Sequence, residues 1–166
     1  MLAKEYCDCI KKKDKPVIIS HHMLMGMKEG QAKMSKSDPN SAIFMEDTRA
    51  EVQKKVKIAF CPPQIIKDNP IIDYVQHIIL PASGKLTVTR KPDNGGVKIY
   101  TTYEELEKDY LSGDLHPGDL KPAVAAAIND LLQPVRDHFE NDPYANELLK
   151  TIRGWQNEIA LANAKK

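Results

Sequence analysis

Two lysines and two serines share the stretch KMSKS, residues 33–37, and Gly26 and Gly30 precede it. Neither a helical nor a strand period explains these residues, so we expect a loop. The ammonium groups of Lys33 and Lys36 suit a polyanion, and a loop that closes over a nucleoside triphosphate would bring them to its phosphates. A solvated basic turn is the plain alternative, but a full KMSKS string is much more specific than two lysines three positions apart.

The residues before this loop predict how a nucleotide would be held. Residues 16–20 form a continuous apolar and β-branched run, which is typical of a strand buried on both faces of a parallel sheet. Ligands of such sheets bind beyond the carboxyl ends of the strands, so the backbone at Met23 and Leu24 is expected to line an adenine site. The adjacent His21 and His22 would point apart on a strand and have no third ligand at a useful spacing, so no metal site is expected.

Composition and charge limit the class of protein. The 166 residues are 42% hydrophobic, which is enough for a core, and the net charge of +1 does not by itself indicate a nucleic-acid partner. Residues 1–60 carry 12 basic and 8 acidic side chains, whereas residues 61–166 carry 12 and 15, so the basic half contains the KMSKS loop. Three cysteines without a metal spacing predict reduced thiols in an intracellular protein, and no apolar run reaches the roughly 20 residues of a membrane span.

Hydrophobic periods and capping residues predict helices and one hairpin for the rest of the chain. Thr48 and Thr102 each begin a capping box, and Gly113 fits a left-handed helix end. Pro81 would end one helix and Pro134 would kink another. The predicted elements are helices over residues 2–13, 48–60, 70–81, 102–113, 120–139 and 143–162, and strands over 86–90 and 97–100 around the turn 91–96.

These elements predict two structural units. A single strand cannot bury both of its faces, so residues 1–47 are expected to be the end of a larger sheet domain. The predicted fold class is an α/β fragment, the end of a Rossmann-like parallel sheet, followed over residues 48–166 by a mostly α-helical domain with a small β-hairpin. In the last helix, the apolar residues expected to face mostly inward are Leu148, Leu149, Ile152, Trp155, Ile159 and Leu161.

Three strings carry a resemblance to a known family. KMSKS with the following Asp-Pro resembles the nucleotide loop of class I aminoacyl-tRNA synthetases. The string LHPGDLK at residues 115–121, ahead of LQPVR at residues 132–136, resembles the anticodon-binding region of tyrosyl-tRNA synthetases of the archaeal and eukaryotic type. SAIFMED at residues 41–47 resembles the eukaryotic members, and the resemblance covers essentially the whole chain. The sister tryptophanyl family shares the fold and a similar loop, but usually lacks the HPxDLK stretch.

The resemblance implies an enzyme that joins tyrosine to ATP, bound with Mg²⁺, and then transfers tyrosine to tRNA(Tyr). It also implies a cytoplasmic homodimer whose upstream half holds the amino acid. Negative charge builds on the leaving pyrophosphate during activation, and two loop ammonium groups would stabilise that charge more in the transition state than in the ground state. Lys33 and Lys36 are therefore the expected catalytic residues, and the expected ATP-binding residues are Met23, Leu24, Lys33, Met34, Ser35, Lys36 and Ser37.

The second motif of class I enzymes, HIGH, does not occur in these 166 residues. The tyrosine pocket and the dimer-forming portion of the family also lie upstream of the matched segment. We therefore interpret the chain as a fragment, or as half of a split enzyme, and expect it to be inactive by itself. A stand-alone tRNA-binding module and a tryptophanyl-tRNA synthetase are the alternatives, whereas a P-loop phosphotransferase is disfavoured because no GxxxxGK[ST] string occurs.

Asp119, in the loop before the long helix, has two possible roles. Its carboxylate suits the N-cap of that helix. Alternatively, the carboxylate accepts two hydrogen bonds from guanine, the first anticodon base that the resemblance places here, while the flat ring of His116 stacks on that base. The family often has an aromatic residue in the hairpin turn where this chain has Asn94, so Asn94 occupies an anticodon position without the usual stacking surface.

Overall fold

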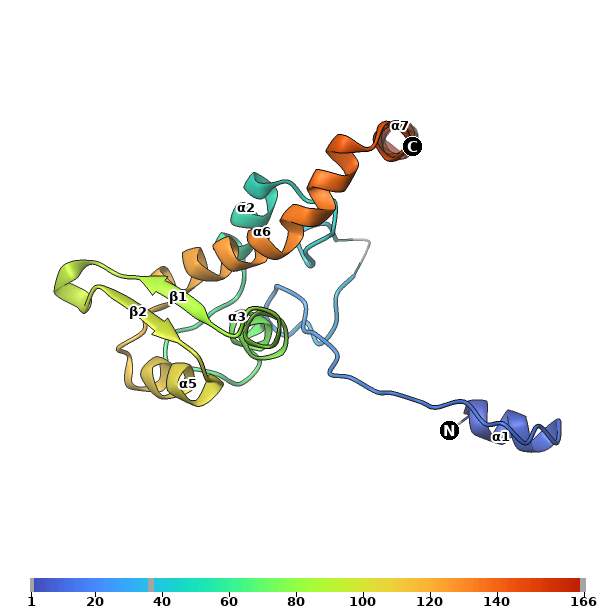
Figure 1. The fold of residues 1–166 in the computed structure, drawn as a ribbon. Helices are drawn as coiled ribbons and strands as arrows, with labels where there is room; N and C mark the ends of the chain where they lie inside the picture. The colour runs from blue at the N-terminus through green and yellow to red at the C-terminus, as the bar shows by residue number, and fades with distance from the viewer. Residues whose placement is uncertain (1, 36–37, 165–166) are drawn as a thin grey trace.

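The computed structural model describes residues 2–35 and 38–164, and it forms a mostly helical body with one two-stranded antiparallel sheet (Figure 1). In chain order the elements are α1 (Leu2–Cys9), α2 (Arg49–Ile58), α3 (Pro70–Tyr74), the π-helical segment η1 (Val75–Ile79), α4 (Leu80–Ser83), β1 (Leu86–Thr89), the 3-10 turn η2 (Pro92–Asn94), β2 (Val97–Tyr100), α5 (Tyr103–Ser112), α6 (Pro117–Asn141) and α7 (Pro143–Ala164).

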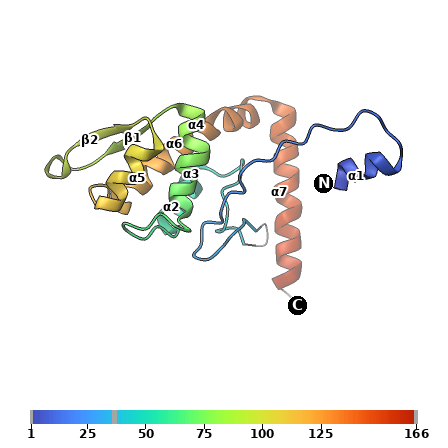
Figure 2. The same ribbon diagram turned by 90° about the horizontal axis from the view of Figure 1, so that it is seen from below.

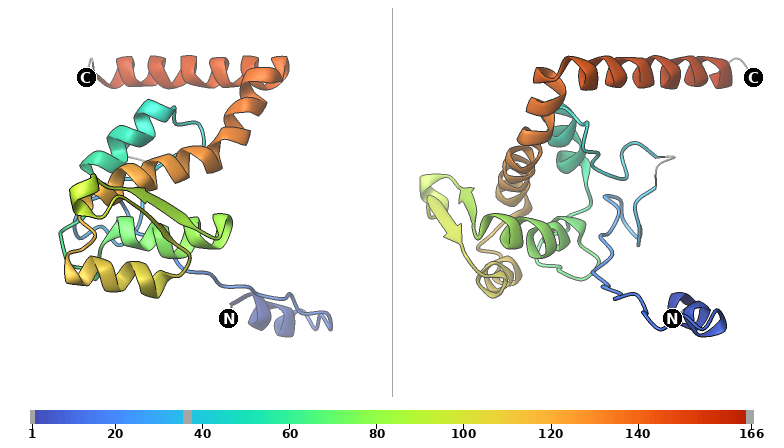
Figure 3. Two further views of the ribbon diagram at one scale, coloured as in Figure 1. Left: turned by 60° about the vertical axis from the view of Figure 1, so that its left-hand side comes forward. Right: turned by 45° about the vertical axis from the view of Figure 1, so that its right-hand side comes forward.

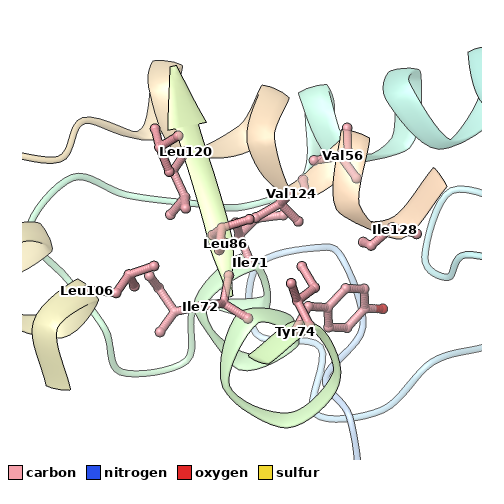
Figure 4. Close-up of a cluster of buried hydrophobic side chains, with 14 of the residues drawn as sticks. Val56, Ile71, Ile72, Tyr74, Leu86, Leu106, Leu120, Val124 and Ile128 are labelled. Carbon is pink, nitrogen blue, oxygen red and sulfur yellow. The ribbon is translucent and has the colours of Figure 1, made fainter. Parts of the chain in front are cut away.

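The core lies where α3, α6 and the hairpin meet (Figure 4). Ile71 and Tyr74 of α3 pack there with Leu86 of β1, and Leu120 and Val124 come from the first turns of α6; all five are almost completely buried. These positions recur at the three- and four-residue spacings of a helix, so one face of α3 and one face of α6 are apolar. α3 and α6 thus bury these faces against each other and against β1.

The predicted hairpin is confirmed. β1 and β2 pair antiparallel, with Leu86 opposite Tyr100 and Val88 opposite Lys98. Leu86 and Val88 are buried whereas the threonines between and after them are exposed, as the alternation of a strand requires. The turn ends at Gly95, whose φ of 91° is a left-handed conformation that glycine adopts without strain.

α2 and α5 begin at the predicted capping residues Thr48 and Thr102, but only the capping box at Thr48 is complete. At α2, the Thr48 side chain accepts from the Glu51 N–H, and the Glu51 carboxylate accepts from the Thr48 N–H at 2.8 Å, so the capping box is complete. At α5, Thr102 accepts from the N–H of Glu105, but the Glu105 carboxylate accepts from the N–H of Thr101. This second box is therefore only half formed.

The strand predicted over residues 16–20 is wrong for this chain. These residues have no regular secondary structure, and Val17 and Ile19 are 89% and 86% exposed. A strand forms only beside another strand that pairs with its N–H and C=O groups, and the described residues offer no such neighbour. The segment instead links the body to α1, which lies apart from it in Figure 1, and the lysines expected at the end of that helix follow its last residue, Cys9.

The helix that begins at Pro70 does not end at Pro81, as predicted, but continues to Ser83. Proline has no N–H to donate to the carbonyl four residues back, and its ring crowds that carbonyl. The chain accommodates this by widening the preceding turn, where the Leu80 N–H donates to the Val75 carbonyl five residues back. The π-helical turn is thus a consequence of Pro81, and Gly84, with φ of 68°, ends the helix.

The inward orientation predicted for the last helix is also wrong. α7 follows α6 and runs across the molecule as a separate arm, while α6 itself changes direction in its carboxyl-terminal half, in line with the kink expected at Pro134 (Figure 3). The apolar period of α7 identifies residues that share a face, but no described element covers that face (Figure 2). The exposed members of this face are Leu148, Ile152, Trp155 and Ile159; Leu161 is exposed on another side of the helix, and Leu149 is partly buried.

Candidate functional site

The loop that carries KMSKS is anchored at Met27, which is completely buried. The Met27 N–H donates to the Ser41 carbonyl at 2.9 Å, so the two ends of the loop meet. The Met27 carbonyl accepts from the Phe60 N–H at 2.8 Å, which ties this base to the residues just after α2. The described residues of the loop, 28–35 and 38–40, therefore project from a fixed stem, as a loop that opens and closes requires.

Side chains also close the loop from within. The Ser41 hydroxyl donates to the carbonyls of Ser35 and Asp38, both at 2.8 Å, and accepts from the Ser35 N–H at 3.1 Å. Lys28 forms an ion pair with Asp38, and the hydrogen bond from Lys28 lowers the pKa of that carboxyl below its ordinary value. Lys28 is thus already neutralised by a protein group. The predicted residues Lys36 and Ser37 lie outside the described part of the chain.

Four of the predicted ATP-binding residues line one cavity of about 590 Å³: Met23, Leu24, Lys33 and Met34. Met34 packs against the core, and the Tyr74 hydroxyl contacts its sulfur at 4.0 Å. This fixes the loop beside the segment expected to hold adenine. A mostly apolar cavity with one lysine at its edge can accommodate a flat base and present an ammonium group to phosphates.

Beyond the loop, the chain is attached to the helical body through Asp47. Its carboxylate accepts from the Phe44 N–H at 2.9 Å and from Lys55 of α2 at 2.6 and 2.9 Å. The Asp47 and Lys55 side chains are both only 8% exposed, so this is a buried ion pair. Arg136 of α6 donates to the Asp47 carbonyl at 2.9 Å, and Arg153 of α7 donates to the carbonyl of Glu46 at 3.2 Å. Three helices thus hold the segment that follows the loop, and the sequence motifs identified none of these contacts.

The residues predicted for the anticodon come together in a second cavity of about 660 Å³. Asn94 lies in the hairpin turn, and His116 and Asp119 lie at the start of α6. The hairpin side is held by Arg90, which donates to the carbonyls of Gly96 and Asp114. The fold therefore brings the hairpin turn and the start of α6 together, although they are more than 20 residues apart in sequence.

The N-cap of α6 is His116, so the first of the two roles considered for Asp119, the cap of this helix, is wrong. The Gly118 N–H donates to His116 Nδ1 at 3.0 Å, so Nδ1 is an acceptor and the ring is held in place. Asp119 is the third residue of the helix and is partly buried. In the described part of the chain, no donor is bonded to its carboxylate, which leaves both oxygens for a ligand in the cavity.

Among the charged residues of this cavity that were not predicted, two form an ion pair. Lys98 of β2 forms an ion pair with Asp109 of α5, and the Tyr100 hydroxyl donates to the same carboxylate at 2.8 Å. Burial acts to raise the pKa of Asp109, but the hydrogen bonds from Lys98 and Tyr100 outweigh it and the pKa lies below its ordinary value. The alternation of β2 predicts that Lys98 and Tyr100 share a face, but their partner on α5 depends on tertiary packing.

Among the described residues, no helix combines the length and the apolar character that crossing a bilayer requires.

Comparison with known proteins places this chain in a family. The model of class I tRNA synthetases (W and Y) matches residues 1–133. Cytoplasmic tyrosine–tRNA ligase 1 of Arabidopsis thaliana is 55% identical over 156 residues, which are 94% of this chain and 40% of that protein.

Solved structures give the same result. Tyrosyl-tRNA synthetase of Leishmania major, in complex with tyrosinol, is 42% identical with a TM-score of 0.78, over 94% of this chain and 31% of that one. The enzyme of Pyrococcus horikoshii, complexed with L-tyrosine, is 40% identical with a TM-score of 0.75, over 84% of this chain and 42% of that one. The chain thus spans less than half the length of these relatives. It belongs to the class I tRNA synthetase family of the tryptophan and tyrosine enzymes, in the tyrosyl branch of eukaryotic and archaeal type.

Proposed function

We propose that these residues are part of a tyrosine–tRNA ligase, which activates tyrosine with MgATP and transfers it to tRNA(Tyr). In this proposal, residues 1–47 end a Rossmann-type catalytic domain and supply the KMSKS loop, and residues 48–166 form the anticodon-binding domain. The remainder of the enzyme supplies the HIGH motif and the tyrosine pocket, and the full protein is a cytoplasmic homodimer. The exposed apolar residues of the 16–20 segment are consistent with a strand that pairs with that remainder.

The observation that carries the proposal is the shared cavity of Met23, Leu24, Lys33 and Met34. This cavity brings Met23 and Leu24, which are expected to contact adenine, together with Lys33, the first lysine of KMSKS. An ammonium group at that edge can approach the phosphates of a nucleotide whose base lies beside Met23 and Leu24. Lys36, Ser35 and Ser37 are assigned to the same nucleotide on the motif alone.

The chemistry of Lys33 and Lys36 follows from where charge appears during tyrosine activation. The tyrosine carboxylate attacks the α-phosphate, and the bond from that phosphorus to the bridging oxygen of pyrophosphate breaks. Negative charge then accumulates on the leaving pyrophosphate. Ammonium groups held by a closing loop stabilise this developing charge, and closure excludes the water that would weaken the interaction.

The second cavity supports anticodon reading. Guanine donates from its ring N–H and its exocyclic amine, and the Asp119 carboxylate offers two acceptor oxygens to that pair. His116, held by its bond to Gly118, presents a fixed flat ring beside it. Because Asp119 does not cap the helix, its carboxylate is left for this role.

Replacing Asp119 by alanine in the full enzyme should weaken aminoacylation without changing tyrosyl-adenylate formation. A bidentate base contact is worth roughly 1–3 kcal/mol, so the preference for guanine at the first anticodon position should fall by about 5- to 150-fold. The measurement compares kcat/KM for native tRNA(Tyr) and for a tRNA with that base changed. The matched control is Asp130→Ala, which removes an aspartate from the same helix whose side chain is 76% exposed. An unchanged preference combined with a lower melting temperature would assign Asp119 a structural role only.

The 166-residue chain alone should not catalyse tyrosine-dependent ATP–pyrophosphate exchange, because it lacks a HIGH motif. Exchange above the background without enzyme would refute the proposal that the amino-acid site lies elsewhere. The same preparation should still bind an anticodon stem-loop of tRNA(Tyr), which shows that the chain is folded. If it neither catalyses exchange nor binds that stem-loop, the assignment of residues 48–166 to the anticodon is wrong.

A further inference from the structure

His22 meets two residues that are about 50 positions away in sequence. Its Nε2 lies 2.7 Å from Oδ1 of Asp73, and Nε2 of His77 lies 3.7 Å from the same oxygen. The sequence offered no third ligand near the two adjacent histidines, and this was one of the two reasons to expect no metal. The fold supplies both missing groups, because α3 and η1 pack beside the segment that leads into the KMSKS loop.

The carboxylate at the centre of this cluster is held in a defined orientation. The Asp73 side chain is 10% exposed, and its Oδ2 accepts from the Met25 N–H at 3.1 Å. That bond directs Oδ1 toward the two imidazole nitrogens. Metal-binding carboxylates are commonly fixed by such a hydrogen bond on the oxygen that does not bind the ion. His22 and His77 are 43% and 33% exposed, so an ion can reach them from solvent.

The arrangement also has the spacing of known metal sites. Asp73 and His77 are four residues apart on one continuous helix, which places both on one face, and His22 comes from a separate loop. Two ligands from one helical turn and a third from elsewhere are typical of zinc sites. The three ligand atoms lie within 4.8 Å of one another. We propose that His22, Asp73 and His77 bind a divalent transition-metal ion of the Zn²⁺ type, with solvent in the fourth position.

The distances require only a small adjustment for such an ion. Bonds of about 2.0–2.1 Å in a tetrahedral site place the ligand atoms about 3.3 Å apart. The two distances from Oδ1 of Asp73, 2.7 and 3.7 Å, lie on either side of this value. The ion would replace the hydrogen bond between His22 and Asp73 with two metal–ligand bonds.

The two rings must change their relative orientation when the ion binds. At present they stack, with centroids 3.9 Å apart and planes inclined by 18°. A metal lies close to the plane of each imidazole that binds it, and two nearly parallel rings have no such common point. His22 belongs to a segment without regular secondary structure, so its ring is the one that can rotate. Binding would then fix His22 to η1, and with it the adjacent Met23 and Leu24 of the proposed adenine site.

Zn²⁺ alone is the probe, so the test does not depend on enzymatic activity. The 166-residue chain with Cys7→Ser and Cys9→Ser is used, because thiols bind zinc and these two, one buried and one exposed, lie together in α1. Titration against a chromophoric chelator at neutral pH should show one bound ion. His77→Ala and His22→Ala should each weaken binding at least about tenfold. Ring resonances of His22 and His77 should shift in NMR spectra as Zn²⁺ is added.

The matched control is His21→Ala, which removes the neighbouring imidazole that is not part of the cluster. It should leave the zinc affinity unchanged, and melting curves without metal should show that every variant is folded. Equal affinities of the parent chain and a His22→Ala/His77→Ala variant would overturn the proposal. Loss of affinity in His21→Ala, with His77→Ala unaffected, would do the same. In either case the cluster is only a carboxylate bonded to one of two stacked histidines.

Discussion

Replacing Lys33 by alanine in the full enzyme is expected to slow tyrosyl-adenylate formation by roughly 100- to 1000-fold, or about 2.7–4 kcal/mol, the cost of removing one donor that acts on transition-state charge. The reason is its position at the cavity that Met23, Leu24 and Met34 also line. The ammonium group gains most of its interaction as charge develops on pyrophosphate, so tyrosine binding should not change. Pre-steady-state formation of the adenylate, measured over a range of ATP concentrations, separates the rate from the binding of ATP.

The matched control for Lys33 is Lys54→Ala. Lys54 is an exposed lysine of α2 that lines neither cavity, so it tests the effect of losing one positive charge. Lys54→Ala should leave adenylate formation within about twofold of wild type, because an exposed charge contributes little. If Lys33→Ala raises only the KM for ATP and leaves the maximal rate intact, Lys33 binds ATP without stabilising the transition state.

Replacing Lys55 by methionine should destabilise the chain by about 3–5 kcal/mol, because it leaves the buried Asp47 carboxylate without its partner. Both side chains are only 8% exposed, and the carboxylate keeps just the N–H of Phe44 as a hydrogen-bond donor. The loss should appear as a lower midpoint in urea unfolding with an unchanged slope. The hydrogen bond from Arg136 to the Asp47 carbonyl does not involve the Lys55 side chain, so the segment after the KMSKS loop should keep this attachment.

Two further variants show whether the unpaired charge causes this loss. Lys54→Met makes the same change at the preceding, exposed position and should shift the free energy of unfolding by no more than about 0.5 kcal/mol. Adding Asp47→Asn to Lys55→Met removes the unpaired charge and should recover a large part of the lost stability. If Lys55→Met is as stable as wild type, the ion pair does not hold this segment.

The sequence predicted those parts of the fold that local residues determine. The capping box at Thr48, the left-handed Gly113 and the hairpin all depend on residues within a few positions of one another, and each of these is confirmed. The convergence of Lys33 with Met23 on one cavity was also expected, since both flank the same short loop.

Other features depend on what a segment packs against, and the sequence alone does not specify this. Residues 16–20 have the composition of a buried strand, but a strand requires partners that the described residues do not include. The apolar period of α7 likewise identifies a face without its covering surface. A cap at Asp119 was one of its two possible roles because aspartate is a common cap, whereas proline at the first helical position moves the cap back to His116.

The most direct test of the central proposal is ATP–pyrophosphate exchange by the natural protein that contains these residues, with tyrosine or tryptophan as the amino acid. We expect exchange with tyrosine, little with tryptophan, and loss of the tyrosine-dependent rate in Lys33→Ala. Exchange that depends on tryptophan, or none with either amino acid from a folded protein that binds tRNA(Tyr), would contradict the assignment to a tyrosine–tRNA ligase.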